Sequence, residues 1–155
     1  MHSQHDDVTW LREIETCKIK GPDGYLYHPV WLNPVEAEKH GIQHGDVVSI
    51  YNERGTVLGA AYVTERVMPG VVYIDHGAKW DPIVPGEIDR GGAINTIVPR
   101  NTTSKNAVGH AVSGFLVGIE KTDMEALKRK YPEAFKRPFH PCAGPGLETC
   151  IKGGE

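Results

Sequence analysis

The sequence contains short polar side chains whose types could hold a phosphorylated ligand. The run from Arg100 to Asn106 includes Thr103, Ser104 and Lys105, and their hydroxyls, backbone N–H groups and ammonium can meet phosphate oxygens. Asn95, shortly before this run, carries a primary amide that can donate and accept paired hydrogen bonds. By itself the run is typical of a solvated loop, and an Asn that follows Gly-Gly is typical of a turn. The residue types therefore indicate binding chemistry without identifying the ligand.

Other residues of reactive type are expected to be structural. Asp46 precedes a predicted strand and Arg54 lies in the turn that follows it, so both should shape the strand crossing rather than catalyse. His40 and His44 share helical spacing, but Gly41 should end the helix between them, and the intervening Glu of a zinc hydrolase helix is absent. No metal site is predicted there.

The three cysteines, Cys17, Cys142 and Cys150, are an odd number, which argues against a full disulfide framework. The spacing of the last two is not that of a zinc site. Three scattered cysteines also cannot hold a four-cysteine iron–sulfur cluster. We expect reduced structural thiols.

The bulk properties exclude several classes of protein. A chain of 155 residues suits one domain, and its net charge of −3 lacks the basic footprint of a nucleic-acid binder. No apolar run approaches the roughly 20 residues that cross a bilayer, so membrane insertion is not expected. The polar N-terminus does not resemble a signal peptide. The location is left open: cytoplasmic, or periplasmic if an export signal lies upstream.

Short β-branched runs separated by turn residues predict a mainly β fold with short helices. A helix is expected from Pro34, with Asn33 as its N-cap and Gly41 just beyond its end. A second helix is expected to begin near Thr122 and to end before Pro132. The expected strands are 46–51, 56–64, 71–74 and 114–120.

The alternation of apolar residues in these strands predicts the core. In the second helix, Met124 and Leu127 are expected to face it. Residues 75–114 form a stretch too long for a simple connecting loop, and we interpret it as functional loops over one end of a barrel. The predicted core includes Val48, Ile50, Val63, Val72, Phe115 and Val117.

The order and spacing of several short motifs resemble the molybdopterin-dinucleotide-binding domain of the dimethyl sulfoxide reductase family. The strongest pieces are Trp31–Pro34, Gly41–Asp46 and Asn52–Gly55. The likeness covers about residues 2–120. Trp10–Glu13, with the 75–78 segment and the 137–141 tail, is most similar to the pyrogallol hydroxytransferase-like branch. Further pieces are His2–Gln4, Val63–Thr64, Pro69–Val72, His76–Ala78, Asp81–Pro82, Gly92–Asn95 and Thr103–Lys105.

The resemblance implies a fold and a division of the chain. The fold would be a six-stranded double-psi β-barrel over residues 1–121. Residues 122–155 would form a C-terminal helix and a Pro/Gly-rich tail that packs on the barrel or on a neighbouring domain.

The resemblance also implies a cofactor, a bis(molybdopterin guanine dinucleotide) that carries molybdenum or tungsten. A pterin edge needs groups that donate and accept, and a pyrophosphate needs hydroxyl, N–H and cationic donors. These residues are expected to converge at one end of the barrel. The implied cofactor contacts are His2, Ser3, Gln4, Asn95, Thr103, Ser104, Lys105 and His110, with His76 a weaker candidate.

In this family the metal ligand lies in an earlier domain, so this chain is expected to carry no metal and no catalytic residue of its own. It would be part of an oxidoreductase or hydroxytransferase, and its expected partners are the catalytic domains of the same large subunit and an iron–sulfur small subunit. Two alternatives stay open: a free-standing subunit that completes a cofactor site in trans, and a non-catalytic double-psi interaction barrel. A self-processing decarboxylase is disfavoured, because the chain has no Gly-Ser dipeptide.

Overall fold

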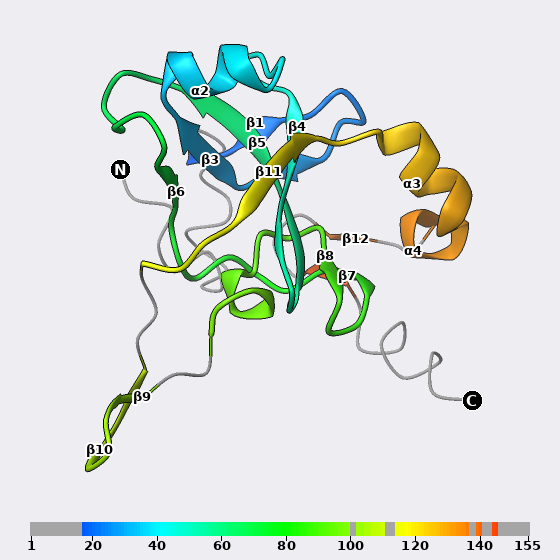
Figure 1. Cartoon of the computed structure of the whole chain (residues 1–155). Coiled ribbons are helices and arrows are strands. Elements are labelled where there is room, and N and C mark those ends of the chain that lie inside the picture. The colour runs from blue at the N-terminus through cyan, green and yellow to red at the C-terminus, as the bar shows by residue number, and fades with distance from the viewer. Residues whose placement is uncertain (1–16, 100–101, 111–113, 137–138, 141–143, 146–155) are drawn as a thin grey trace.

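The computed structural model describes residues 17–99, 102–110, 114–136, 139–140 and 144–145. They form a mainly β chain with few short helices (Figure 1), which confirms the predicted class, while the closed double-psi arrangement stays a prediction. Within these ranges no helix is long and apolar enough to cross a membrane. The strands are β1 (Ile19–Lys20), β2 (Leu26–Tyr27), β3 (Pro29–Leu32), β4 (Val47–Asn52), β5 (Gly55–Val63), β6 (Val72–Ile74), β7 (Pro82–Val84), β8 (Ile88–Asp89), β9 (Thr102–Ser104), β10 (Ala107–His110), β11 (Gly118–Lys121), β12 (Phe139–His140) and β13 (Gly144–Pro145). The helices are α2 (Pro34–Lys39), α3 (Met124–Lys130), α4 (Pro132–Lys136) and the 3-10 turn η2 (Ile94–Thr96).

A mixed sheet forms the centre, in the order β11–β4–β5–β3–β6, with the β7–β8 pair joined to the start of β5. β4 and β5 form the long antiparallel hairpin in the middle of Figure 1, and β3 runs parallel to the far half of β5. A Cβ on Gly59 would lie 2.4 Å from Val30 Cγ2 and 2.8 Å from the His28 carbonyl oxygen. Glycine at this position therefore permits the close approach of β3 and β5.

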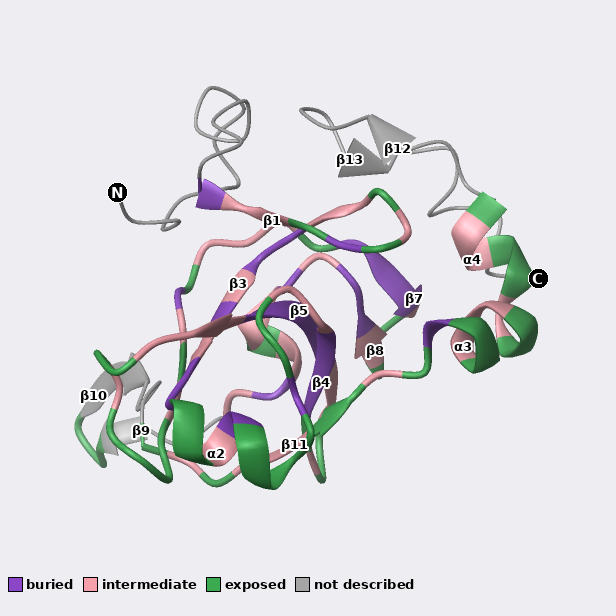
Figure 2. Ribbon diagram, turned by 90° about the horizontal axis from the view of Figure 1, so that it is seen from above, coloured by how far each residue is buried: buried purple, intermediate pink, exposed green. Residues whose placement is uncertain are grey.

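The main apolar core lies against this sheet, and Figure 2 shows the buried segments along β3, β4 and β5. Val48 and Ile50 are fully buried, as predicted. The other four predicted core residues are half-buried and pack against the same cluster. They are Val63, Val72, Phe115 and Val117.

The last strand of the sheet begins later than the sequence predicts. β11 starts at Gly118 rather than at Gly114, whose φ of 75° places it in a turn conformation that a strand cannot continue. The predicted alternation nevertheless holds, because Phe115 and Val117 pack on the core and Leu116 between them is 93% exposed.

The first predicted helix is confirmed with its cap. Asn33 Oδ1 accepts the Val35 N–H at 3.0 Å, Pro34 begins α2, and Gly41 follows the end with φ 62°. This cap is local, since the residues that make it are neighbours in the chain.

The second predicted helix is confirmed, since α3 begins near Thr122 and ends before Pro132. Asp123, not Thr122, caps α3 by accepting the Ala126 N–H at 2.9 Å. The Thr122 hydroxyl instead lies 2.8 Å from Ser49 Oγ on β4. Met124 and Leu127 pack on a second apolar cluster, as predicted.

Candidate functional site

A buried polar network holds the loops that follow β6. Asp81 and Asp89 are each 1% exposed and Arg90 is 6% exposed. Arg90 Nη2 and Nε donate to Asp81 Oδ2 at 2.8 and 3.0 Å. Asp89 accepts the N–H groups of Asp81 and Ala93, both at 2.7 Å. The β7–β8 pair is thereby joined to Ala93, the residue before η2.

Aromatic rings enclose the ion pair of this network. The Arg90 guanidinium lies 4.3 Å from the centre of the Tyr25 ring and 5.2 Å from that of Phe135 in α4. The Tyr25 hydroxyl donates to Asp81 Oδ2 at 3.1 Å. Burial opposes the charge on Arg90, but the neighbouring Asp81 outweighs it and raises the pKa of the guanidinium. The guanidinium is therefore held in its charged form away from water.

Burial also raises the pKa of two other groups of the network, the Asp89 carboxyl and the Tyr25 hydroxyl. It raises the pKa of the Asp89 carboxyl to about 6, although the backbone N–H groups of Ala93 and Asp81 oppose the rise. Burial, followed by the negative charge of Asp81, raises the pKa of the Tyr25 hydroxyl well above its usual value. Enclosure is therefore the main cause of both shifts.

The Gly-Gly pair before η2 is required by close backbone contacts. A Cβ on Gly91 would lie 1.9 Å from the Lys79 carbonyl oxygen. Gly92 has a φ of 92°, and its Cβ would lie 2.6 Å from the Cβ of His28. The chain therefore folds back on the 79–81 segment before it turns through η2, where Asn95 is exposed.

Asn95 lines a groove of about 730 Å³ on this part of the molecule. The groove is enclosed by the β4–β5 turn, the segment before β7, the turn before β8, and η2. Asn52 connects the β4–β5 turn to the end of η2. Its Oδ1 accepts the Arg54 N–H at 2.9 Å, and its Nδ2 donates to the Ile97 carbonyl at 2.8 Å. The lining residues are Arg54, Ala78, Trp80, Gly86, Ala93, Asn95, Thr96 and Val98.

The role of Arg54 extends beyond the sequence expectation. Its backbone belongs to a structural turn, as predicted, but its side chain also lines the groove. Asp46 is structural as predicted: it accepts the Gln43 N–H at 2.8 Å and pairs with Lys121 at 2.9 Å.

The predicted phosphate contacts lie on a hairpin that projects from the sheet (Figure 1). Ser104 and Lys105 are exposed near its tip, and Ser104 Oγ accepts the Asn106 N–H at 3.1 Å. Thr103 and His110 belong to β9 and β10, with His110 paired to Thr102, but their side chains lie outside what the structure describes. The predicted contacts His2, Ser3 and Gln4 lie outside the described residues as well.

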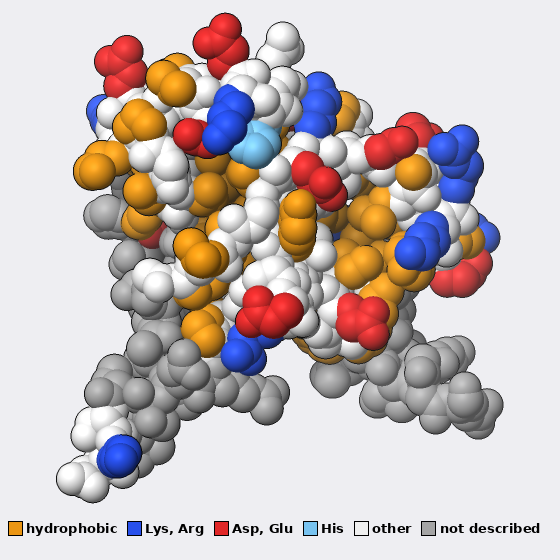
Figure 3. Space-filling model, in the orientation of Figure 1, with side chains coloured by type: hydrophobic (Ala, Val, Ile, Leu, Met, Phe, Trp, Pro, Cys, Tyr) orange, Lys and Arg blue, Asp and Glu red, His pale blue; other side chains and the backbone are white. Residues whose placement is uncertain are grey.

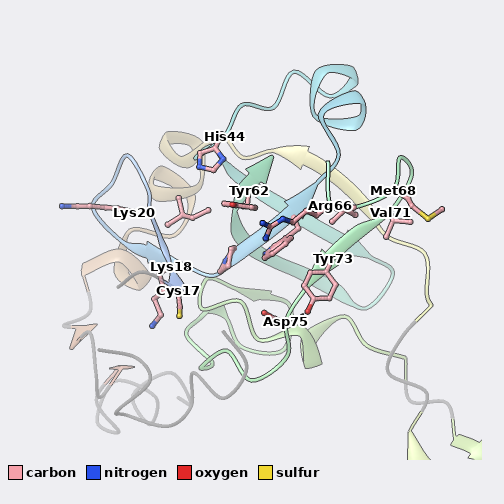
Figure 4. Close-up of a pocket in the computed structure, with 14 residues that line it drawn as sticks. Cys17, Lys18, Lys20, His44, Tyr62, Arg66, Met68, Val71, Tyr73 and Asp75 are labelled. Atoms are coloured by element: carbon pink, nitrogen blue, oxygen red, sulfur yellow. Dashed lines mark hydrogen bonds between the residues drawn. The ribbon is translucent and has the colours of Figure 1, made fainter. Parts of the chain in front are cut away.

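A larger hollow of about 990 Å³ was missed by the sequence analysis (Figure 4). Trp31 on β3 forms part of its wall. The cross-strand neighbours of Trp31 are Tyr62 on β5 and Tyr73 on β6, at ring-centre distances of 5.0 and 5.7 Å. Arg66 points into the hollow, and Cys17, a free buried thiol, lies at its edge, while Cys142 and Cys150 lie outside the described residues. Hydrophobic side chains gather on the β6 side of the surface (Figure 3), where Met68 is 73% exposed.

The histidines with helical spacing do not form a metal site among the described residues. His44 instead packs edge-on against Tyr62, at 5.2 Å between ring centres. His40 Nε2 lies 3.8 Å from Glu36 Oε2. No group of three or more His, Cys, Asp or Glu in the described part of the chain could hold a metal ion.

The family profile described as "Molydopterin dinucleotide binding domain" matches residues 2–113. The chain belongs to this family. Molybdopterin guanine dinucleotide is accordingly its cofactor. The matched range contains η2, the groove residues and the projecting hairpin.

Relatives of known function are much longer proteins. The pyrogallol hydroxytransferase large subunit of Pelobacter acidigallici is 43% identical over 127 residues, which cover 79% of this chain and 14% of the relative. Dimethyl sulfoxide reductase DmsA of Escherichia coli K12 is 44% identical over 92 residues, 59% of this chain and 11% of the relative. Trimethylamine-N-oxide reductase 1 of the same strain is 37% identical over 124 residues, 78% and 14% respectively. These relatives place the chain in the dimethyl sulfoxide reductase family, and it spans 11–14% of their length.

The chemistry of the groove fits this cofactor. The Asn95 amide both donates and accepts, as the edge of a pterin requires, and the Thr96 hydroxyl does the same. Arg54 offers a cation to a phosphate, and Trp80, 44% exposed, offers a flat apolar face. A planar, anionic, hydrogen-bonding ligand can be accommodated by this donor set.

Proposed function

We propose that this chain binds one face of a bis(molybdopterin guanine dinucleotide) as the C-terminal domain of the large subunit of a molybdenum or tungsten oxidoreductase or hydroxytransferase. The observation that carries the proposal is the exposed Asn95 amide in a groove of suitable donors, within the range matched by the cofactor-binding family. The relatives include both reductases and a hydroxytransferase, so the proposed reaction class is kept equally broad.

The proposal includes a six-stranded double-psi barrel over residues 1–121 and a separate role for residues 122–155. β8 and β3 both run parallel to β5, β8 beside its first residues and β3 beside its last, and this supports a crossed-strand arrangement rather than a simple meander. Packing of Met124 and Leu127 on the second apolar cluster supports a C-terminal helix that covers the barrel.

At the cofactor, we assign Asn95 to the pterin edge and the other predicted contacts to the same end of the barrel. η2 and the β9–β10 hairpin both lie on the lower side of the sheet in Figure 1, which supports a shared surface. The remaining contacts in this proposal are His2, Ser3, Gln4, Thr103, Ser104, Lys105 and His110.

The bound cofactor supplies redox or hydroxyl-transfer chemistry at its metal, whose protein ligand we assign to another domain. This chain orients the cofactor through Asn95 and excludes water from one side of it. The other partners in the proposal are the catalytic domains of the same subunit and an iron–sulfur small subunit. A free-standing subunit that acts in trans would use the same groove.

The test is the variant Asn95→Leu in the holoenzyme that contains this chain. Loss of the amide leaves buried pterin groups unpaired, at a cost of about 1–3 kcal/mol for each group. Cofactor content per polypeptide should fall, while the melting curves of the variant and the wild type, compared without cofactor, should be the same. Gln43→Leu removes an exposed amide from the segment that follows α2 and should leave the content unchanged, because α2 and η2 lie on opposite sides of the sheet (Figure 1). Equal cofactor content in Asn95→Leu and in the wild type would remove Asn95 from the site.

A further inference from the structure

Arg54 is the only charged residue among the described residues that line the groove. Its side chain is 35% exposed, and its Nε lies 3.6 Å from Glu53 Oε1. Glu53 is 78% exposed, so water screens this pair and it contributes little. The guanidinium therefore keeps most of its donor capacity for a ligand in the groove.

The backbone around Arg54 is held on two sides. Asn52 fixes the turn through its bonds to the Arg54 N–H and to the Ile97 carbonyl. On the other side, the Thr56 N–H donates to the Glu87 carbonyl at 2.7 Å, and a Cβ on Gly55 would lie 2.7 Å from that same oxygen. The position of Arg54 relative to Asn95 is thus preset by the fold, which lowers the entropy cost of binding.

We propose that Arg54 binds the pyrophosphate of the dinucleotide, next to the pterin contact made by Asn95. The proposal rests on the function proposed above and adds to it a residue for which the sequence predicts only a structural role. A guanidinium presents a rigid fork of N–H donors that matches two phosphate oxygens, whereas an ammonium offers a point charge. No other cation among the described lining residues can make this contact.

The experiment compares the wild type, Arg54→Gln, Arg54→Lys and Asn95→Leu in the holoenzyme that contains this chain. The measured quantity is the rate at which protein-bound dinucleotide is lost, followed as guanosine monophosphate recovered from the protein after hydrolysis, at low and at high salt. Arg66→Gln, an arginine in the aromatic hollow, is the matched control. Melting curves identify any variant that fails to fold.

Arg54→Gln should lose the dinucleotide roughly 10- to 100-fold faster at low salt, the range expected for a charged hydrogen bond. Its loss should also depend less on salt than that of the wild type, because the screened attraction has been removed. Arg54→Lys should keep the salt dependence with an intermediate rate, and Arg66→Gln should match the wild type. A salt dependence of Arg54→Gln equal to that of the wild type would overturn the role of Arg54, and so would an unchanged rate. If Asn95→Leu alone loses cofactor, the proposed function stands without Arg54, and if neither variant does, the proposed function itself fails.

Discussion

The sheet core and the loop region after β6 are stabilised in different ways. Under the sheet, Val48, Ile50 and Val57 are at most 1% exposed and pack by shape alone. In the loop region, Asp81 and Asp89 are just as buried, yet they are held by specific hydrogen bonds to Arg90 and to backbone N–H groups. The core can exchange one apolar side chain for another of similar volume, whereas the network needs each of its partners.

The difference explains how a groove can be rigid without being apolar. Chain segments that carry exposed binding groups cannot bury enough apolar surface to fix themselves. Here the fixed point is the Asp89 carboxylate, which accepts the Ala93 N–H two positions before Asn95. A buried polar network therefore positions the binding group, and the apolar core supports the network from below.

The largest expected effect is that of breaking the network. Asp81→Ala leaves Arg90 buried without its partner carboxylate, which should destabilise the chain by about 3–5 kcal/mol. Chemical denaturation of the 155-residue chain measures this loss. A cost below about 1 kcal/mol would mean that the network is not essential to the loop region.

The pH dependence of stability should reveal Asp89. Its pKa in the folded chain is raised to about 6, above the usual value of 3.8, so the folded state holds the proton more tightly than the unfolded state. Its contribution to stability is therefore present near pH 4, decreases as the pH rises through 6, and is constant above that. The shift corresponds to about 2–3 kcal/mol.

Denaturation of wild type and Asp89→Asn at several pH values between 4.5 and 7.5 isolates this group. The difference in the free energy of unfolding between the two proteins should change over the acid part of the range and level off above pH 6.5. A difference that does not vary with pH would show that Asp89 is ionised throughout.

The smallest expected effect is that of a conservative change in the core. Ile50→Val removes one methylene and should cost about 0.5–1.5 kcal/mol. The isosteric change Asp81→Asn in the network, measured in the same way, should cost more. The contrast between the two regions is wrong if the order of these two costs is reversed.

Sequence reasoning succeeded where the signal is local. The cap of α2 follows from Asn33, Pro34 and Gly41, which are near neighbours in the chain. The burial of Val48 and Ile50 follows from the pattern of a strand. The start of α3 near Thr122 follows from local residues too, whereas the contact of the Thr122 hydroxyl with Ser49, far away in sequence, does not.

Long-range contacts carry the features that the sequence analysis missed. Tyr25 meets Asp81 across 56 positions, and nothing in the local pattern of either residue indicates the pair. The contacts of Trp31 with Tyr62 and Tyr73 depend on the register of three strands, which periodicity does not determine. The turn containing Arg54 could be predicted from Asn52–Gly55, but the groove that this turn shares with Asn95 could not.

The most direct test of the central claim is a structure of the holoenzyme that contains this chain, with its cofactor bound. The Asn95 amide should lie within hydrogen-bond distance of a molybdopterin atom, and the dinucleotide should fill the groove between the β4–β5 turn and η2. A groove occupied by another protein domain, with Asn95 remote from the cofactor, would contradict this claim.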